Sequence, residues 1–302
     1  MREAYLDING VGTRVSTYGK WIEESVECNE DIVIIIPGNP GITGFYDKFA
    51  KLLHESLGYS VWCIGHAGHN IPKERISPLP ALKGNEELYG LKGQIKSKAE
   101  FLEKYVPKDG NIHIIAHSIG AYMALDLLKH PSIRDRLVDM YLLFPAVEYI
   151  AETKGGKILN WFAKYILWLI IFMAGIFNLF PTILQNILLN IYMFVTRTST
   201  SQHRHNIKML IQPAVLRRVF FLAFEEMEQV RERNNVVIKE NVEKIRFLYG
   251  KKDRWAPFSY YENIKKDIPN VDAHVCGLQH AFVLRQSAEV ALIVSDWIKS
   301  KK

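Results

Sequence analysis

Asn-Ile-His-Ile-Ile-Ala-His-Ser-Ile-Gly, residues 111–120, decides how this chain of 302 residues folds. Residues 111–116 are β-branched and mostly apolar, which is typical of a buried strand. From Ala121 to Lys129 the apolar residues recur at helical spacing. A strand that turns sharply into a helix places Ser118 at the apex, with its hydroxyl pushed outward and close to the helix N-terminal amides. This arrangement is typical of a nucleophile.

The usual pattern for such an elbow is Gly-x-Ser-x-Gly, and Ala116 occupies the position of the first glycine. Small residues are needed because strand and helix pass close together, and alanine is the mildest departure. A structural interpretation is also open, in which Ser118 only caps the following helix.

The first 150 residues alternate between strand-like and helix-like stretches, which is typical of a mostly parallel sheet with crossover helices on both faces. The same pattern returns after residue 240. We therefore predict an α/β core in two parts, residues 1–150 and 241–302, with an inserted helical cap at 151–240. The predicted strands are 31–36, 59–64, 111–116, 138–144, 245–249 and 272–276, and the predicted helices include 45–57, 88–105 and 289–300.

Within the insert, residues 165–196 contain no charged side chain. A bilayer core of about 30 Å requires about 20 helical residues, so this stretch is too long for one span and too short for two. Gly175, Asn178 and Pro181 interrupt its middle, where we expect a turn. Basic residues flank both sides, which favours a hairpin with both ends in the cytoplasm: Lys154, Lys157, Lys164, Arg197, Arg204 and Lys208. The alternative is a pair of core or lid helices in a soluble enzyme.

The net charge of +6 is modest and the basic residues are scattered, which argues against nucleic acid as a partner. Cys28, Cys63 and Cys276 are far apart and lack metal-binding spacing, as expected of reduced thiols in a cytosol-facing protein. Residues 1–20 lack an apolar core, so we predict no cleavable signal peptide.

Nucleophilic acyl transfer requires a serine, a histidine base, a carboxylate that orients the histidine, and donors for the oxyanion. In α/β hydrolases these groups come in the order Ser, Asp or Glu, His. Asp253 follows a glycine turn after the strand at 245–249, and His280 lies in the loop before the last helix. Since catalytic groups gather at the carboxyl ends of parallel strands, we expect Ser118, Asp253 and His280 to meet as nucleophile, acid and base.

An alternative acid is Glu148, which follows the strand at 138–144. Some lipases carry the acid after this preceding strand. The sequence Phe-Pro-Ala-Val-Glu, however, resembles the start of the inserted region, and we favour Asp253.

The remaining histidines near these motifs have structural interpretations. His113 lies inside the nucleophile strand and is predicted to be a core or strand-end residue. His117 directly precedes Ser118 and points away from it, so it is expected to pack behind the site. His66 and His69 lie in a loop and could line the pocket.

The oxyanion requires two backbone donors. The amide of Ile119, next to the nucleophile, is one. The other is expected from the Pro-Gly-Asn-Pro-Gly loop at residues 37–41, with Asn39 as the best donor and Pro40 holding the loop rigid or in a cis bond. The structural alternative is a plain turn.

These motifs together resemble the lipid droplet-associated hydrolase family of α/β hydrolases. The resemblance covers most of the chain and is carried by residues 37–41 with Phe45 and Tyr46, residues 116–122, residues 250–253 and His280. The Pro-Gly-Asn-Pro-Gly loop is distinctive, because most hydrolases have His-Gly there. The resemblance implies a triad of Ser118, Asp253 and His280 and an insert that anchors the enzyme to lipid droplets and the endoplasmic reticulum. It also implies a link to cholesteryl ester and triacylglycerol turnover, with Ala116 leaving room for weak activity.

We therefore expect a serine ester hydrolase of neutral lipids at the cytosolic face of these membranes, acting without metal or cofactor. Because Ser118 precedes the insert while Asp253 and His280 follow it, the insert must return or never cross the bilayer. Two other functions stay open: a soluble esterase or thioesterase with an apolar lid, and a non-enzymatic droplet scaffold. The preferred ester and the oligomeric state stay open as well.

Overall fold

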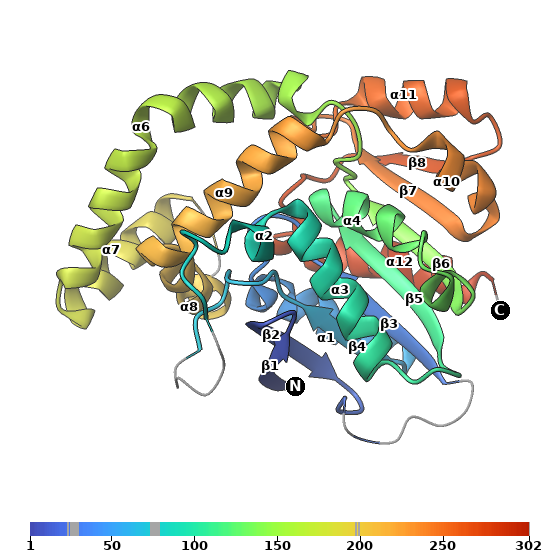
Figure 1. The fold of residues 1–302 in the computed structure, drawn as a ribbon, viewed down its shortest axis with the longest axis horizontal. Helices are drawn as coiled ribbons and strands as arrows, with labels where there is room; N and C mark the ends of the chain where they lie inside the picture. The colour runs from blue at the N-terminus through green and yellow to red at the C-terminus, as the bar shows by residue number, and fades with distance from the viewer. Residues whose placement is uncertain (23, 25–29, 73–78, 197, 199, 302) are drawn as a thin grey trace.

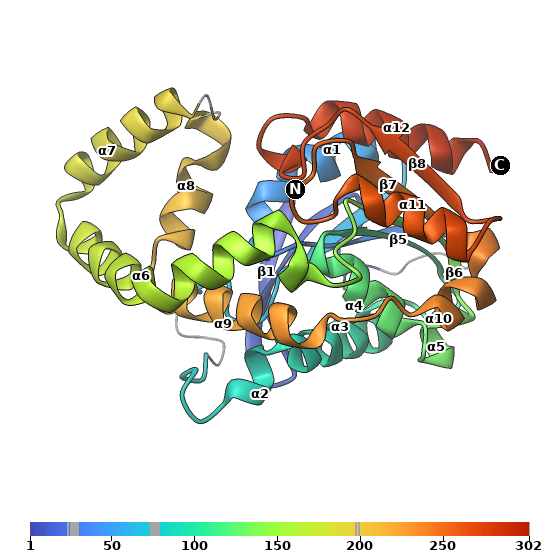
Figure 2. The same ribbon diagram turned by 90° about the horizontal axis from the view of Figure 1, so that it is seen from above.

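The computed structural model describes residues 1–22, 24, 30–72, 79–196, 198 and 200–301 (Figures 1 and 2). The side chains of residues 163, 164 and 200–202 are outside this description. Cys28 and Arg197, which enter the predictions above, also lie outside the described residues.

An eight-stranded sheet forms the centre of the molecule, with strand order β1-β2-β4-β3-β5-β6-β7-β8. The strands from β4 to β8 along this order are parallel to one another, and β1 and β2 add an antiparallel hairpin at one edge. The strand bounds are β1 Arg2–Ile8, β2 Val11–Tyr18, β3 Asp31–Ile36, β4 Ser60–Ile64, β5 Asn111–His117, β6 Leu137–Leu143, β7 Ile245–Gly250 and β8 Asp272–Cys276. The six predicted strands are therefore confirmed, and the predicted mostly parallel sheet with them.

The two faces of the sheet bury alternate residues of each strand, as a sheet covered on both sides requires. Ile32, Ile34 and Ile36 pack with α3 and α4, whereas Val33 and Ile35 pack with α1 and α12. Figure 2 shows these helix pairs on opposite sides of the sheet. The core helices are α1 Asp47–Leu57, α2 Glu86–Tyr89, α3 Leu91–Tyr105, α4 Ile119–Leu127, α5 Pro131–Arg134, α11 Phe258–Asp267 and α12 Ser287–Lys299.

The predicted helix at 88–105 is wrong in one respect, because the chain breaks at Gly90 into α2 and α3. A Cβ atom at Gly90 would lie 2.4 Å from a carboxylate oxygen of Glu225. That oxygen accepts a hydrogen bond from the Leu91 amide at 2.7 Å. The break therefore gives the first amide of α3 an acceptor from the insert.

The hairpin of β1 and β2 was not among the predicted strands. Its turn is Asn9-Gly10, with φ angles of 51° and 73°, which is the residue pair that two-residue hairpin turns prefer. Thr13, Ser16 and Thr17 are buried in β2, so the polar composition of this segment does not reflect exposure. The Asn-Gly turn is the signal by which the hairpin could have been found.

The insert forms α6 Lys154–Leu179, α7 Thr182–Val195, α8 Thr200–Leu210, α9 Pro213–Gln229 and α10 Asn235–Glu240. In Figures 1 and 2, α6, α7 and α8 form a lobe beside the sheet, while α9 runs back across it. The expected turn lies at Phe180 and Pro181 only, since Gly175 and Asn178 remain inside α6. The side-chain Nδ2 of Asn178 donates to the Ile211 carbonyl at 3.1 Å, and its side-chain Oδ1 accepts from Gln212 Nε2 at 2.7 Å. This residue therefore connects α6 to the junction between α8 and α9.

In the described part of the chain, no single helix has both the length and the apolar composition of a membrane span. Two segments of α6, Lys154–Phe162 and Tyr165–Leu179, together have the length and composition of a span, but a bend of 71° lies between them.

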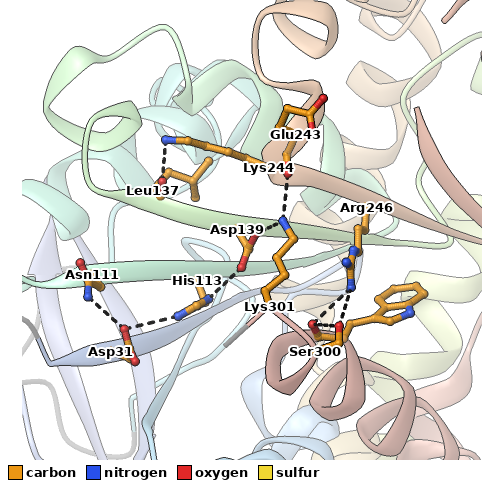
Figure 3. A network of polar contacts seen from close by, with 11 residues as sticks. Asp31, Asn111, His113, Leu137, Asp139, Glu243, Lys244, Arg246, Ser300 and Lys301 are labelled. Carbon is orange, nitrogen blue, oxygen red and sulfur yellow. Dashed lines mark hydrogen bonds and ion pairs between the residues drawn. The ribbon is translucent and has the colours of Figure 1, made fainter. Parts of the chain in front are cut away.

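A polar network lies at the end of the sheet where the parallel strands begin (Figure 3). His113 of β5 lies between the carboxylates of Asp31 and Asp139, at 3.6 and 3.7 Å. Lys301, near the end of the chain, forms an ion pair with the buried Asp139. His113 is thus the buried strand residue that the sequence predicts, and it lies at the end of β5 opposite Ser118.

Gly120 is the position at which α4 and β3 come closest. A Cβ atom there would lie 2.5 Å from the carbonyl oxygens of Ile36 and Pro37, at the end of a strand that is paired with β4 through Ile35 and with β5 through Ile36. We expect Gly120→Ala to lower the free energy of unfolding by about 2–4 kcal/mol. Gly175→Ala is the matched control: it has no neighbour within 4 Å, so it should stabilise α6 by about 0.5–1 kcal/mol. Urea unfolding followed by circular dichroism measures both changes, and equal midpoints for wild type and Gly120→Ala would contradict this account.

Candidate active site

Ser118 lies at a sharp junction between β5 and α4 and has a φ angle of 53° and a ψ angle of −123°. A positive φ is strained for a residue other than glycine, at a cost of order 1–3 kcal/mol, and is held here from both sides. The Ser118 amide donates to the Leu143 carbonyl at 3.0 Å, and its own carbonyl accepts from Ala121 and Ala146 at 3.0 and 3.1 Å. The elbow expected from the sequence is therefore present, with the alanine at position 116 fully buried beneath it.

Ser118, His280 and Asp253 form a continuous chain of hydrogen bonds. The distance from Ser118 Oγ to His280 Nε2 is 2.9 Å, and that from His280 Nδ1 to Asp253 Oδ2 is 2.7 Å. A carboxylate only accepts hydrogen bonds, so Nδ1 carries the proton and Nε2 of a neutral ring accepts from the serine hydroxyl. The three side chains are thus brought together in the arrangement of a general base and its nucleophile.

The Asp253 carboxylate is held in place by the backbone. Its side chain is fully buried, and Oδ1 accepts from the amides of Trp255 and Ala256 at 2.8 and 3.1 Å. The other oxygen is thereby directed at His280. Glu148, the alternative acid, forms a buried ion pair with Arg233 instead, and Arg233 also binds Asp267 at 2.6 Å.

A second chain of hydrogen bonds runs behind the nucleophile, from the 37–41 loop to the histidine loop. The Gly38 amide donates to the Tyr46 hydroxyl at 2.8 Å, and this hydroxyl lies 2.6 Å from His117 Nδ1. His117 Nε2 lies 2.9 Å from the His280 carbonyl, which can only accept. Burial lowers the pKa of His117 well below its usual range, so the neutral ring donates to His280 and accepts from Tyr46. His117 therefore joins the two loops, and it also borders the cavity that contains Ser118 and His280.

In the 37–41 loop, the backbone amide of Gly38 donates to Tyr46 and that of Gly41 donates to His69. The two prolines have no N–H, so we assign the backbone amide of Asn39 as the donor for a substrate. The Asn39–Pro40 bond is cis. Asn39, Ser118 and His280 all border the same cavity, and Ile119 begins α4 directly after Ser118. The amides of Asn39 and Ile119 therefore stay the predicted oxyanion donors.

His66 and His69 lie behind the 37–41 loop and are fully buried. His69 Nδ1 accepts from the Gly41 amide at 3.0 Å, and the His66 amide donates to the Gly41 carbonyl at 2.9 Å. Burial lowers the pKa of His69 to about 3, so this ring is neutral at physiological pH. The two histidines support the loop and are not among the described residues that line the cavity next to Ser118.

The cavity next to Ser118 has a volume of about 360 Å³ and is mostly apolar. The sheet side of its wall is formed by the loops that carry Asn39, Ser118 and His280. The insert provides the opposite wall, through Leu159, Leu210, Val219, Phe220, Ala223 and Glu226. In the described part of the chain, no group of three or more His, Cys, Asp or Glu side chains has the arrangement of a metal site.

Comparison with known proteins places this architecture in a family. The model of the family described as "Lipid-droplet associated hydrolase" matches residues 29–283. The chain belongs to the lipid droplet-associated hydrolase family. It is 44% identical to the protein of that name from Drosophila melanogaster, over 100% of this chain and 99% of the relative. The mouse protein of the same name is 34% identical, over 100% of this chain and 96% of the relative.

Solved structures place this member of the lipid droplet-associated hydrolase family among the α/β hydrolases. A laboratory-evolved variant of potato epoxide hydrolase superposes with a TM-score of 0.65, covering 99% of each chain at 14% identity. At this identity the likeness concerns the fold alone, and it confirms the α/β-hydrolase fold.

Glu226 of α9 is a pocket residue of this family member that the sequence reasoning did not single out. Its carboxylate accepts from the Asn39 side-chain amide at 2.9 Å, and the same amide donates to the Val219 carbonyl at 3.0 Å. Burial raises the pKa of Glu226 to about 8, against the opposing effect of the hydrogen bond from Asn39. The available signal was a pair of carboxylates, Glu225 and Glu226, in an otherwise apolar helical stretch, Phe-Phe-Leu-Ala-Phe-Glu-Glu-Met. The insert thereby fixes the side chain of the proposed oxyanion residue.

The raised pKa of Glu226 makes stability depend on pH. Between about pH 4.5 and 8 the unfolded chain loses this proton while the folded chain keeps it, so wild-type stability falls as pH rises through this window. We expect Glu226→Gln to remove this pH dependence. The difference in the free energy of unfolding, variant minus wild type, should rise by at least about 2 kcal/mol from pH 4.5 to 8 and then stay constant. Urea unfolding at a series of pH values measures the difference. Glu228→Gln, on the exposed side of the same helix, is the control, and a pH-independent difference for Glu226→Gln would contradict the assignment.

Proposed function

We propose that this chain is a serine ester hydrolase that acts on neutral lipids, of the cholesteryl ester or triacylglycerol class, at the surface of lipid droplets or the endoplasmic reticulum. The observation that carries the proposal is the hydrogen-bonded chain Ser118–His280–Asp253 at the wall of an apolar cavity. The name of the relatives, lipid droplet-associated hydrolase, supports both the reaction class and the location.

In the first half of the proposed reaction, His280 Nε2 takes the proton of Ser118 as Oγ bonds to the ester carbonyl carbon. Asp253 stabilises the resulting imidazolium through Nδ1. The tetrahedral intermediate then collapses, its bond to the alcohol oxygen breaks, and the alcohol leaves with the proton from Nε2. The product of this half is an acyl group on Ser118.

In the second half, His280 takes a proton from water, and the hydroxide adds to the acyl carbon. Collapse breaks the bond to Oγ, and Ser118 recovers its proton from Nε2. In both halves the carbonyl oxygen becomes an anion, which the amides of Asn39 and Ile119 stabilise. Donors already in position require little reorganisation when the charge develops, and one such donor contributes about 10²–10³-fold in rate.

The outer surface of the hairpin supports attachment to a lipid surface. On α6, Trp168 and Phe172 lie one helical turn apart and are 69% and 58% exposed. On α7, Ile183 is 76% exposed and Phe194 is 85% exposed. Contiguous bulky apolar side chains of this kind mark interaction surfaces, and tryptophan favours the boundary between lipid and water. A droplet has a single phospholipid leaflet, which suits helices that lie in the surface rather than cross it.

The order of the triad along the chain supports the same attachment. Ser118 precedes the insert, whereas Asp253 and His280 follow it. In space, however, His280 lies within hydrogen-bond distance of both Ser118 and Asp253. Both ends of the insert therefore lie on the same side of any membrane that it enters.

Activity tests the catalytic assignment. A fluorophosphonate probe should label wild type at Ser118 and leave Ser118→Ala unlabelled. Asp253→Asn should lower the kcat for cholesteryl oleate or triolein by about 10³–10⁴-fold, because the tautomer of His280 is lost. Asp296→Asn, an exposed carboxylate on α12, should keep wild-type turnover. An unlabelled wild-type protein would favour the scaffold function, and exclusive turnover of oleoyl-coenzyme A would favour a thioesterase.

Flotation with triolein droplets coated by a phosphatidylcholine monolayer tests the attachment. Burying one large apolar side chain contributes about 1.5–3 kcal/mol, so losing four should weaken binding at least about 100-fold. The variant combines Trp168→Ser, Phe172→Ser, Ile183→Ser and Phe194→Ser. The control combines Val236→Ser on α10 and Leu292→Ser on α12, which are 65% and 63% exposed and lie outside α6 and α7. Unchanged flotation of the fourfold variant would favour a soluble enzyme with an apolar lid.

A further inference from the structure

A second, larger cavity, open to the surface, lies between α6, α7 and α8. Its volume is about 680 Å³. Apart from Tyr192, the side chains that line it are aliphatic, methionine or phenylalanine, among them Ile166, Met173, Ala174 and Leu189. Such a lining offers contacts to a hydrocarbon and few partners to a polar ligand.

Three elements connect this cavity to the one beside Ser118. Leu210, the last residue of α8, lines both cavities. Helix α6 lines the Ser118 cavity with Leu159 and the second cavity from Ile166 onward. On α9, Leu216 faces the second cavity and Val219, one turn further along, faces the first. The two spaces are thus neighbours separated at Leu210.

The second cavity also reaches the surface that we assign to lipid. Its lining includes Met173 and Tyr192, which are each 53% exposed on α6 and α7. None of the described side chains that line the second cavity is an acid or a base other than Tyr192, whereas Glu226 and His280 lie in the Ser118 cavity. The lipid-facing helices, this space and Leu210 therefore offer an acyl chain a continuous series of apolar contacts toward the nucleophile.

We propose that the cavity between α6, α7 and α8 holds the distal part of the substrate's acyl chain, with Leu210 at the passage to Ser118. The assignment rests on the proposed function and deepens it, because it makes a long-chain acyl ester the substrate class. The Ser118 cavity holds the ester group and the proximal carbons, and the hydrophobic effect favours transfer of the remaining chain into the lobe.

The experiment compares two probes that carry the same fluorophosphonate head and an ethyl or a hexadecyl chain, with the full-length protein in detergent. Intact-protein mass spectrometry gives the labelling rate of Ser118 for each. Ala174→Trp places an indole in the cavity from a buried position on α6, and Leu189→Trp does so from α7. We expect each to lower the ratio of hexadecyl to ethyl rates at least about tenfold. Leu292→Trp, on the exposed side of α12, should keep the wild-type ratio.

Binding of cis-parinaric acid to Ser118→Ala gives a second measurement that needs no reaction at Ser118. Adding Ala174→Trp or Leu189→Trp should weaken this binding at least about tenfold, and two positions guard against one variant that fails to fold. In a protein that is labelled at Ser118, an unchanged ratio in both variants overturns the acyl-chain site. If neither probe labels the wild type, the proposed function fails, and the acyl-chain site is then judged by parinaric acid binding alone. Weaker binding in the two tryptophan variants supports the site, and binding equal to that of Ser118→Ala overturns it.

Discussion

The close approach of α4 to the end of β3 is the constraint on which the rest of the site depends. At Gly120 the helix backbone comes so near the carbonyls of Ile36 and Pro37 that a Cβ atom would lie 2.5 Å away, and at Gly38 a Cβ atom would lie 2.9 Å from that of Ser118. This contact lets the 37–41 loop lie directly against the serine elbow, and the side chains of Tyr46 and His117 hold the loop there. Backbone donors held in this way keep their direction without the entropy cost of ordering side chains, which is what stabilisation of a transient oxyanion requires.

The sequence predicts the core of this fold well, because strands buried on both faces leave uninterrupted apolar runs and because the order of Ser118, Asp253 and His280 is set by the topology. It is less informative where tertiary contacts override composition. Strand β2 contains a buried Arg14 that pairs with Glu3, so the polar composition of the N-terminal hairpin suggests exposure where the structure has burial. Glu226 could not be assigned for the same reason: its role depends on a contact with Asn39 across 187 residues of sequence.

Strand β5 shows how two identical residues on one strand take different roles. His117 lies four positions after His113, an even offset, so the two side chains point to the same face of the sheet. They differ in the edge at which they lie. His113 is at the edge where strands begin, between Asp31 and Asp139, whereas His117 is at the edge where strands end, between Tyr46 and His280. The two residues are of the same type and lie on the same face of the sheet. Only their position along the strand differs: His113 contacts two carboxylates at one edge, whereas His117 joins the loops of the site at the other.

The insert is part of the site and also carries the surface that we propose for lipid attachment, so the two roles are difficult to separate by deletion. Helix α9 holds Asn39 through Val219 and Glu226, while Leu159 and Leu210 close the cavity in front of Ser118. Asn178 and Gln212 in turn join the hairpin to the start of α9. Removing residues 165–196 would therefore withdraw the attachment surface, open the cavity and release α9 at once, so loss of membrane binding and loss of activity would have one cause. Substitution of exposed side chains separates the two, because Trp168 and Ile183 are 69% and 76% exposed and do not line the cavity next to Ser118.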